Sequence, residues 1–138
     1  MAVLRILLSL FFVAAGAMHF LHPAAYLRIM PAYLPNPLLL VYLSGLGEVA
    51  GGIGVLVPGL RRIAGYGLIL LLVAVFPANI HMALNHISPT GATLPVWLLW
   101  LRLPLQALLI AGVWFLCIKT GGHSANKAAH NKIVTQHR

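Results

Sequence analysis

The chain has 138 residues, of which 61% are hydrophobic and only 7% are charged. Soluble domains carry about 25% charged residues, so this composition excludes an ordinary water-soluble fold and indicates an integral membrane protein. The net charge of +8 does not indicate a nucleic-acid partner, because the basic residues flank hydrophobic runs instead of gathering on one soluble domain. A single cysteine, Cys117, excludes an intramolecular disulfide.

The first hydrophobic run covers residues 3–21. It could be a signal peptide, since Arg5 forms a short positive region and Ala15-Gly16-Ala17 resembles a cleavage site. The run continues through Met18 and Phe20, past the point where the apolar part of a signal peptide ends. We therefore expect a retained transmembrane helix.

A proline-rich segment, residues 22–37, follows this run. Prolines at this density end helices and favour extended backbone in the residues that precede them. Between them, residues 24–30 are suited to a short helix at the membrane interface, with the Arg28 side chain reaching toward water.

Three further apolar runs have the roughly 20 residues that cross a bilayer core, at 38–57, 63–84 and 96–118. Pro77 lies inside the second of them and should bend that helix. Short connections make neighbouring helices antiparallel. The predicted fold is all-α, a four-helix transmembrane bundle over residues 1–118 followed by a basic tail over 119–138.

The basic residues also predict an orientation. With four spans, most of them fall on one side of the membrane, namely Arg5, Arg61, Arg62, Lys119, Lys127, Lys132 and Arg138. Only Arg28 and Arg102 lie toward the other side. The excess of basic residues in cytoplasmic loops then places both termini in the cytoplasm.

Glu48 is the only acidic residue of the chain and lies in the middle of the second predicted span. Small residues surround it at helical spacing or form a Gly-x-x-x-Gly pattern: Ser44, Gly45, Gly47, Gly51 and Gly52. Such residues let helices pack closely, so Glu48 is expected to face the bundle interior. Two roles stay open for this carboxylate, a structural ion pair and the handling of protons or a ligand.

Arg102 is the predicted ion-pair partner of Glu48, because their depths in the membrane differ by only about 6 Å at 1.5 Å per residue. Gln106 lies one turn from Arg102 on the same face and could extend the network. The alternative is that the Arg102 side chain simply extends to the outer membrane surface.

His19 and His81 lie near the outer ends of their spans, with Asn79 slightly deeper. On an ideal helix Asn79 and His81 point about 160° apart, so both face inward only if Pro77 distorts the helix. Each histidine alone could be an interfacial polar residue. Together with Glu48, these side chains and those of Arg102 and Gln106 predict a polar pocket that opens outward.

Cofactor expectations are limited. His19 and His81 could in geometry hold a haem, but nothing fixes their facing, so haem is disfavoured. No metal site is predicted within the spans. In the tail, His123, His130 and His137 recur every seven residues. Metal binding by that row is one interpretation, and a solvated tail that binds anionic lipids is the favoured one.

A series of short motifs resembles the DoxX family of small bacterial four-span membrane proteins. The motifs are Gly16-Ala17-Met18-His19-Phe20, Met30-Pro31-Ala32-Tyr33-Leu34-Pro35, Ser44-Gly45 with Glu48 and Gly51-Gly52, Pro58 before Arg61-Arg62, Val75-Phe76-Pro77-Ala78-Asn79-Ile80 with Met82, and Arg102-Leu103-Pro104-Leu105-Gln106. The resemblance implies a multi-pass protein of the bacterial inner membrane that is associated with redox chemistry. The family's matching positions would be His19, Glu48, Asn79, Arg102 and Gln106.

Three functions are compatible with these features. The first is a redox-associated subunit whose polar pocket takes a quinone head group or a small sulfur ligand, with a membrane or soluble redox partner. The second is an assembly factor or scaffold without chemistry of its own, in which the small residues pack a partner helix or a second copy. The third is a small proton-coupled transporter. Whether the protein is an enzyme stays open.

Overall fold

The computed structural model describes residues 1–88, 91–92 and 94–120. This part of the chain contains helices and turns and no strand. The helices are α1 (Ala2–Leu21), α2 (Pro23–Ile29), α3 (Pro37–Leu56), α4 (Arg61–Leu84) and α5 (Val96–Val113), and α5 continues into the π-helix η1 (Trp114–Lys119).

Four of these elements are long and apolar enough to cross a membrane: α1, α3, α4, and α5 together with η1. Each begins and ends within about two residues of a run expected from the sequence. The all-helical class and the four candidate spans are therefore confirmed, and they suggest a multi-pass membrane protein. The short helix α2 lies where an interfacial helix is expected.

Prolines set several helix ends. Pro23 and Pro37 occupy the first positions of α2 and α3. A backbone N–H at this position has no partner within the helix, so proline can be accommodated there. At the other end of α3, Val57 precedes Pro58 and is extended, with φ −84° and ψ 114°. A residue before proline avoids the helical region, so α3 ends there and the chain turns into α4.

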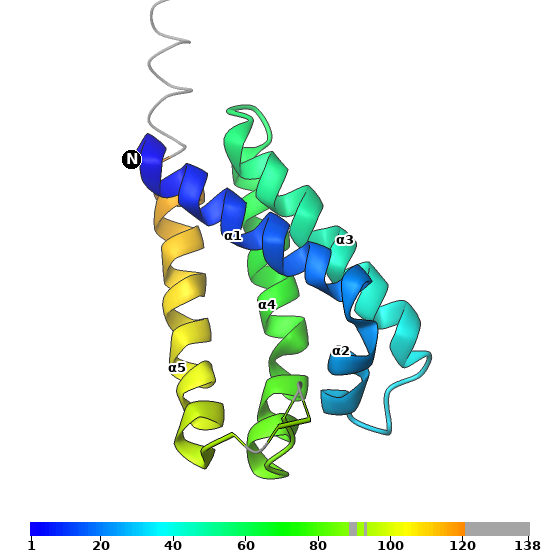
Figure 1. Cartoon of the computed structure of the whole chain (residues 1–138). Helices are drawn as coiled ribbons and strands as arrows, with labels where there is room; N and C mark the ends of the chain where they lie inside the picture. Colours follow the sequence, from blue (N-terminus) through cyan, green and yellow to red (C-terminus); the bar gives the residue numbers. More distant parts are fainter. Residues whose placement is uncertain (89–90, 93, 121–138) are drawn as a thin grey trace, which may run out of the picture.

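The long helices pack in the order α1, α3, α4 and α5 (Figure 1). At the end that carries the N-terminus, Arg5 of α1 donates from Nε to the Leu116 carbonyl at 3.0 Å and from Nη2 to Oγ1 of Thr120 at 2.7 Å. These bonds join α1 to η1. At the other end α1 is followed by α2, which packs on α3 and α4, and α5 keeps to α4. The arrangement is thus open between α5 and α1.

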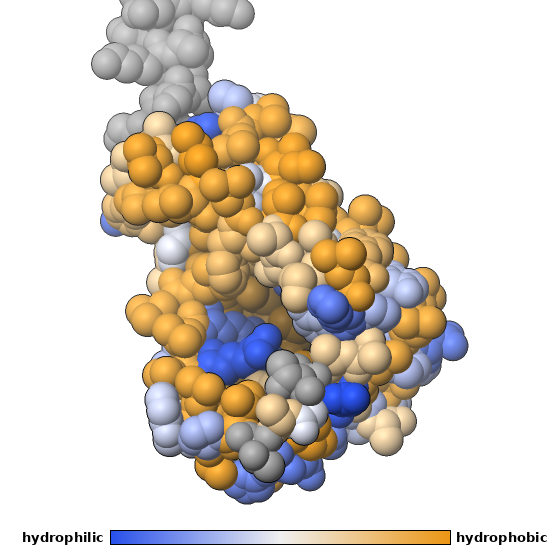
Figure 2. Space-filling model, in the orientation of Figure 1, coloured by the Kyte–Doolittle hydropathy of each residue, from blue (hydrophilic) through white to orange (hydrophobic). Residues whose placement is uncertain are grey.

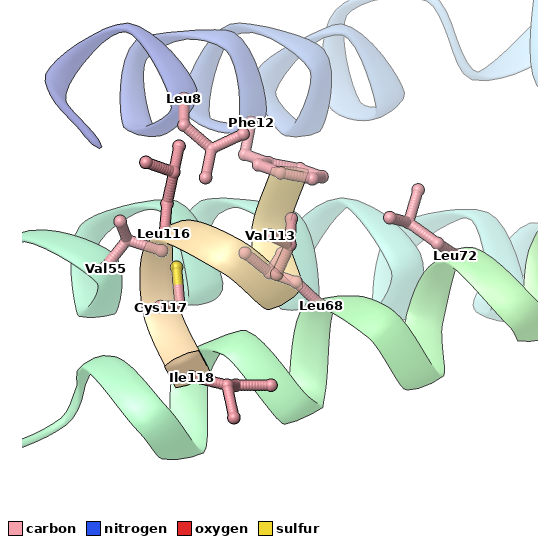
Figure 3. Close-up of a cluster of buried hydrophobic side chains, with 9 residues drawn as sticks. All are labelled: Leu8, Phe12, Val55, Leu68, Leu72, Val113, Leu116, Cys117 and Ile118. Atoms are coloured by element: carbon pink, nitrogen blue, oxygen red, sulfur yellow. The ribbon is translucent and has the colours of Figure 1, made fainter. Parts of the chain in front are cut away.

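Buried apolar side chains form two clusters at different heights. The larger one lies toward the N-terminus and η1 and is shown in Figure 3: Leu8, Phe12, Val55, Leu68, Leu72, Val113, Leu116, Cys117 and Ile118. The smaller one, near α2, contains Ile29, Met82, Ala83 and Leu99. Along α4, Asn79 lies between Leu72 and Met82, which belong to different clusters. The buried polar residues other than Ser9 therefore occupy a layer between two apolar ones.

Candidate functional site

The centre of the polar layer is set by a backbone contact between α1 and α3. A Cβ added to Gly16 would lie 2.6 Å from the Gly45 carbonyl oxygen, and one added to Gly45 would lie 2.7 Å from Cβ of His19. Residues three positions apart share a helix face. His19 follows Gly16 by three residues and Glu48 follows Gly45 by three, so the glycine contact brings His19 and Glu48 together.

The side chains of His19 and Glu48 approach to ion-pair distance at this site. Nδ1 of His19 lies 3.5 Å from Oε2 of Glu48 and 3.0 Å from the Ala15 carbonyl oxygen. A carbonyl oxygen can only accept, so Nδ1 carries a proton and donates it to Ala15. Oε2 of Glu48 is buried and has no hydrogen-bond donor among the described residues. The imidazole thus interacts electrostatically with Glu48 but donates no hydrogen bond to Oε2.

The second carboxylate oxygen of Glu48, Oε1, has a different environment. The residue as a whole is 9% exposed. Oε2 is enclosed and has no hydrogen-bond partner. Oε1 also has no donor among the described residues, but it is not enclosed. Oε1 therefore lies at the accessible edge of the site with its lone pairs unused. A carboxylate so placed within an apolar span is a strong acceptor for any donor that reaches it.

Tyr26 of α2 closes one side of the pair. Its ring stacks on the His19 imidazole with the centroids 3.8 Å apart and the planes at 22°. Burial raises the pKa of the Tyr26 phenol above its usual value of 10.0, and the Glu48 charge adds to this shift while Arg102 opposes it. The phenol is therefore neutral at physiological pH and can act as a hydrogen-bond donor.

Arg102 of α5 lies within electrostatic range of the same group. Its charge acts on His19, Tyr26 and Glu48, yet the side chain is exposed and has no hydrogen bond or ion pair to any residue that the structure describes. Among the described residues, Glu48 has His19 and not Arg102 at ion-pair distance. α5 packs on α4, not on α3, whereas α1 meets α3 through glycines, so His19 reaches Glu48 and Arg102 stays at longer range.

Asn79 and Gln106 join α4 to α5 beside this group. Nδ2 of Asn79 donates to Oε1 of Gln106 at 2.7 Å, and Nε2 of Gln106 donates to the Leu72 carbonyl. Pro77 has no N–H and disturbs the backbone ladder of α4 at this level, although the helix continues through it. Side chains of a neighbouring helix commonly bind backbone groups that such a proline frees. Gln106 binds the Leu72 carbonyl, which is next to the carbonyl of Val73 that an N–H at position 77 would have bonded.

His81 does not join the layer. Nδ2 of Asn85 lies 3.1 Å from Nδ1 of His81 and donates to the His81 carbonyl at 2.8 Å, both in an exposed position. Asn79, two residues earlier, is 8% exposed and faces inward. Of the two side chains that point apart on one helix, α4 therefore turns only Asn79 toward the site. His81 has no described contact with His19 that would make a bis-histidine site.

The small residues of α3 allow close packing on two faces of this helix, one against α1 and one against α4. Gly45 and Gly52 lie against α1, where a Cβ on Gly52 would come within 3.0 Å of the Ser9 carbonyl oxygen. Gly51 and Gly47 face α4, and a Cβ on Gly51 would lie 2.5 Å from Leu68. Ser44 is half-buried. Most of the stripe thus serves packing within the chain.

A separate apolar groove of about 550 Å³ lies between α3 and α4. Its lining includes Gly47, Gly51, Gly54, Gly67, Leu68 and Leu71, without any titratable side chain. A Cβ on Gly67 would meet nothing within 4 Å, so the groove is open at that point. This groove is distinct from the polar layer.

One face of the molecule lies between α5 and the α1–α2 side. Figure 2 shows this face hollowed between the two, with hydrophilic residues along the hollow and hydrophobic residues over most of the surrounding surface. We call this the lateral hollow. It opens sideways through the apolar surface of the molecule, where the acyl region of a bilayer would lie.

No group of three or more histidine, cysteine or acidic side chains that could hold a metal ion occurs in the described part of the chain. The tail histidines His123, His130 and His137 lie outside the described residues, as does any lipid contact of the tail.

Two contributors to the site were not predicted. Tyr26 was expected only as part of an interfacial helix, and Gly16 only as part of a possible cleavage site and of one motif that resembled the DoxX family. A pairing of Gly16 and His19 with Gly45 and Glu48 at equal spacing was available as a signal. The ring stack of Tyr26 depends on how α2 folds back and had no sequence signal.

Comparison with known families matches residues 8–117 to a family model described as a domain of unknown function, DUF8561. The resemblance to the DoxX family is therefore wrong, because the matching family is a different one. The motifs that suggested it are short and built of common membrane-helix residues. No curated protein and no solved structure matches the chain.

Proposed function

Since the chain belongs to the DUF8561 family, whose function is unknown, we propose a function from the site itself: the protein binds, within the membrane, the polar head group of a small amphiphile of quinone-like size. The proposed ligand enters through the lateral hollow with its apolar tail among the lipids. The redox association drew its support from the DoxX resemblance and is not part of this proposal.

One observation carries the proposal. Ionised Glu48 and Arg102 have opposite charges, lie within electrostatic range of each other, and have no hydrogen bonds to described residues. Leaving such a group unpaired at the centre of a span costs about 2.5–3.5 kcal/mol on the insertion scale. A head group with a donor and an acceptor would satisfy both side chains at once.

The proposed orientation in the membrane has both termini in the cytoplasm. Arg5 and Arg61 are close enough for their charges to interact, and Arg5 also contacts η1, which ends at Lys119. These basic side chains thus gather at one end of the molecule. The positive-inside tendency favours that end as the cytoplasmic one, and the site then lies toward the outer half.

Ligand titration of the purified protein in nanodiscs tests the proposal. The probes are a benzoquinone with a decyl tail and its reduced, dihydroxy form, and empty nanodiscs of the same lipid give the partition baseline. We expect saturable binding of at least one probe, weakened at least about tenfold in Arg102→Gln. Arg62→Gln, an exposed arginine at the opposite end of α4 from the site, is the matched control. Binding that never saturates above the baseline would refute the function.

A scaffold role is a second candidate, favoured by the open groove at Gly67. It predicts that filling the groove, by Gly67→Leu, disrupts co-purification of a partner or self-association while Arg102→Gln does not. A Gly67→Leu variant that keeps the same complexes as the wild type would remove this candidate.

A further inference from the structure

We infer that the ligand of this site is an uncharged, hydroxyl-bearing head group that binds as a hydrogen-bond donor to Glu48. The inference rests on the proposed function and narrows its ligand class. It follows from the balance of donors and acceptors that the described residues leave unused.

Glu48 presents only acceptors. Oε1 is accessible and no described residue donates to it, and Oε2 is enclosed without a donor. His19 cannot supply the missing bond, because its Nδ1 proton is directed to the Ala15 carbonyl. In a neutral imidazole with the proton on Nδ1, Nε2 is an acceptor as well. The α1–α3 side of the site therefore requires a donor.

Arg102 presents only donors. A guanidinium has five N–H groups and no acceptor, and none of them is used by a described residue. A hydroxyl oxygen both donates one hydrogen and accepts others. A hydroxyl group thus complements both sides, whereas a carbonyl, ether or carboxylate head offers Glu48 a second acceptor and leaves its oxygen unpaired.

The charges of the site favour an uncharged head group. With a neutral His19, the formal charges of ionised Glu48 and Arg102 sum to zero. A carboxylate ligand would face Glu48 and an ammonium ligand would face Arg102, in a layer enclosed by two apolar clusters where charge interactions are weakly screened. The half-buried Tyr26 ring, stacked on His19, offers a flat surface beside these groups. A ring that carries the hydroxyl, as in a phenol, suits this surface.

A pair of probes that differ only in the donor tests the inference. They are 4-octylphenol and its methyl ether, titrated against the wild-type protein in nanodiscs with empty nanodiscs as baseline. Hydrogen bonds to charged groups are worth about 1.5–3 kcal/mol, so we expect the phenol to bind about 10- to 100-fold more tightly than the ether. In Glu48→Gln, which keeps the size and removes the charge, this ratio should fall to about threefold or less.

The outcomes separate the two proposals. Equal binding of phenol and ether to the wild type would overturn the donor assignment while the proposed function stands. Tighter binding of 4-octylbenzoate than of the phenol would overturn the uncharged class. Saturable binding of none of these ring compounds, nor of the decyl quinone pair, would overturn the proposed function itself. The wild-type comparison needs no variant, so a Glu48→Gln protein that fails to fold leaves the test intact.

Discussion

Oε2 of Glu48 lies 3.5 Å from Nδ1 of His19, and this pair joins α3 to α1 in the middle of an otherwise apolar molecule. Its position follows from the glycine contact one turn away, where the two backbones approach too closely for a side chain. The pair leaves the carboxylate without a full hydrogen bond. It therefore fixes the place of Glu48 while keeping Glu48 available to another donor.

Gly45→Ala should separate the pair. The new Cβ would lie 2.7 Å from Cβ of His19 and 2.8 Å from the Gly16 carbonyl oxygen, neither of which is the flexible end of a side chain. We expect a loss of about 1–3 kcal/mol in unfolding free energy, the usual cost of overpacking, and weaker head-group binding. Unfolding by a denaturing detergent, followed by circular dichroism, measures the first effect.

The matched control is Gly67→Ala on α4. A Cβ at Gly67 meets no atom within 4 Å, and alanine favours helix over glycine. Stability should be unchanged or slightly higher. An equal loss of stability in both variants would show that the α1–α3 contact is not the cause.

Gln106→Leu should weaken the contact between α4 and α5. It removes the acceptor for Asn79 and the donor for the Leu72 carbonyl. Hydrogen bonds between membrane helices average about 0.6 kcal/mol and reach about 1.7, so we expect a loss of about 1–3 kcal/mol for the two bonds. A double-mutant cycle with Asn79→Leu isolates the direct bond, and a coupling energy of zero would contradict its presence.

Tyr26 should titrate only at alkaline pH. Its pKa is raised above 10.0 by burial, so the folded protein favours the neutral phenol. Stability is then unaffected by this group below about pH 10 and falls as the pH rises through the pKa of the folded state. The absorbance at 295 nm of the wild type minus that of Tyr26→Phe measures the titration, and a midpoint below 10 would be contrary to the structure.

Arg102→Gln should affect binding and spare folding. The side chain is exposed and has no contact with described residues at ion-pair distance, so unfolding free energy should change by no more than about 0.5 kcal/mol. Head-group binding should fall at least about tenfold. Arg102→Lys, which keeps the charge but not the planar donors, should be intermediate. A large loss of stability in Arg102→Gln would instead assign this arginine a structural role.

The four spans and the inward facing of Glu48 could be predicted from sequence, because both depend on local composition and helical spacing. The partner of Glu48 could not. Judged by depth in the membrane, Arg102 and His19 were equally possible partners of Glu48. Only the packing order of the helices shows that His19 is the one that reaches it. The same reason separates Asn79 from His81: two residues on one helix point apart, and the sequence does not say which one faces the site.

The sequence also did not predict that the helix arrangement is open on one side. Short loops fix which helices follow one another but not whether the last one closes on the first. Here α2 packs beside α3 and α4, and α5 meets α1 mainly through η1. The lateral hollow, on which the proposed function depends, is a result of that packing.

The most direct test of the account is native mass spectrometry of the protein released from mild detergent after incubation with the decyl quinone pair. If the site binds the head group as proposed, we expect one bound ligand per chain in the wild type and in Arg62→Gln, and loss of that ligand in Arg102→Gln. A wild-type protein that carries no ligand, or an Arg102→Gln protein that retains it at equal occupancy, would contradict it.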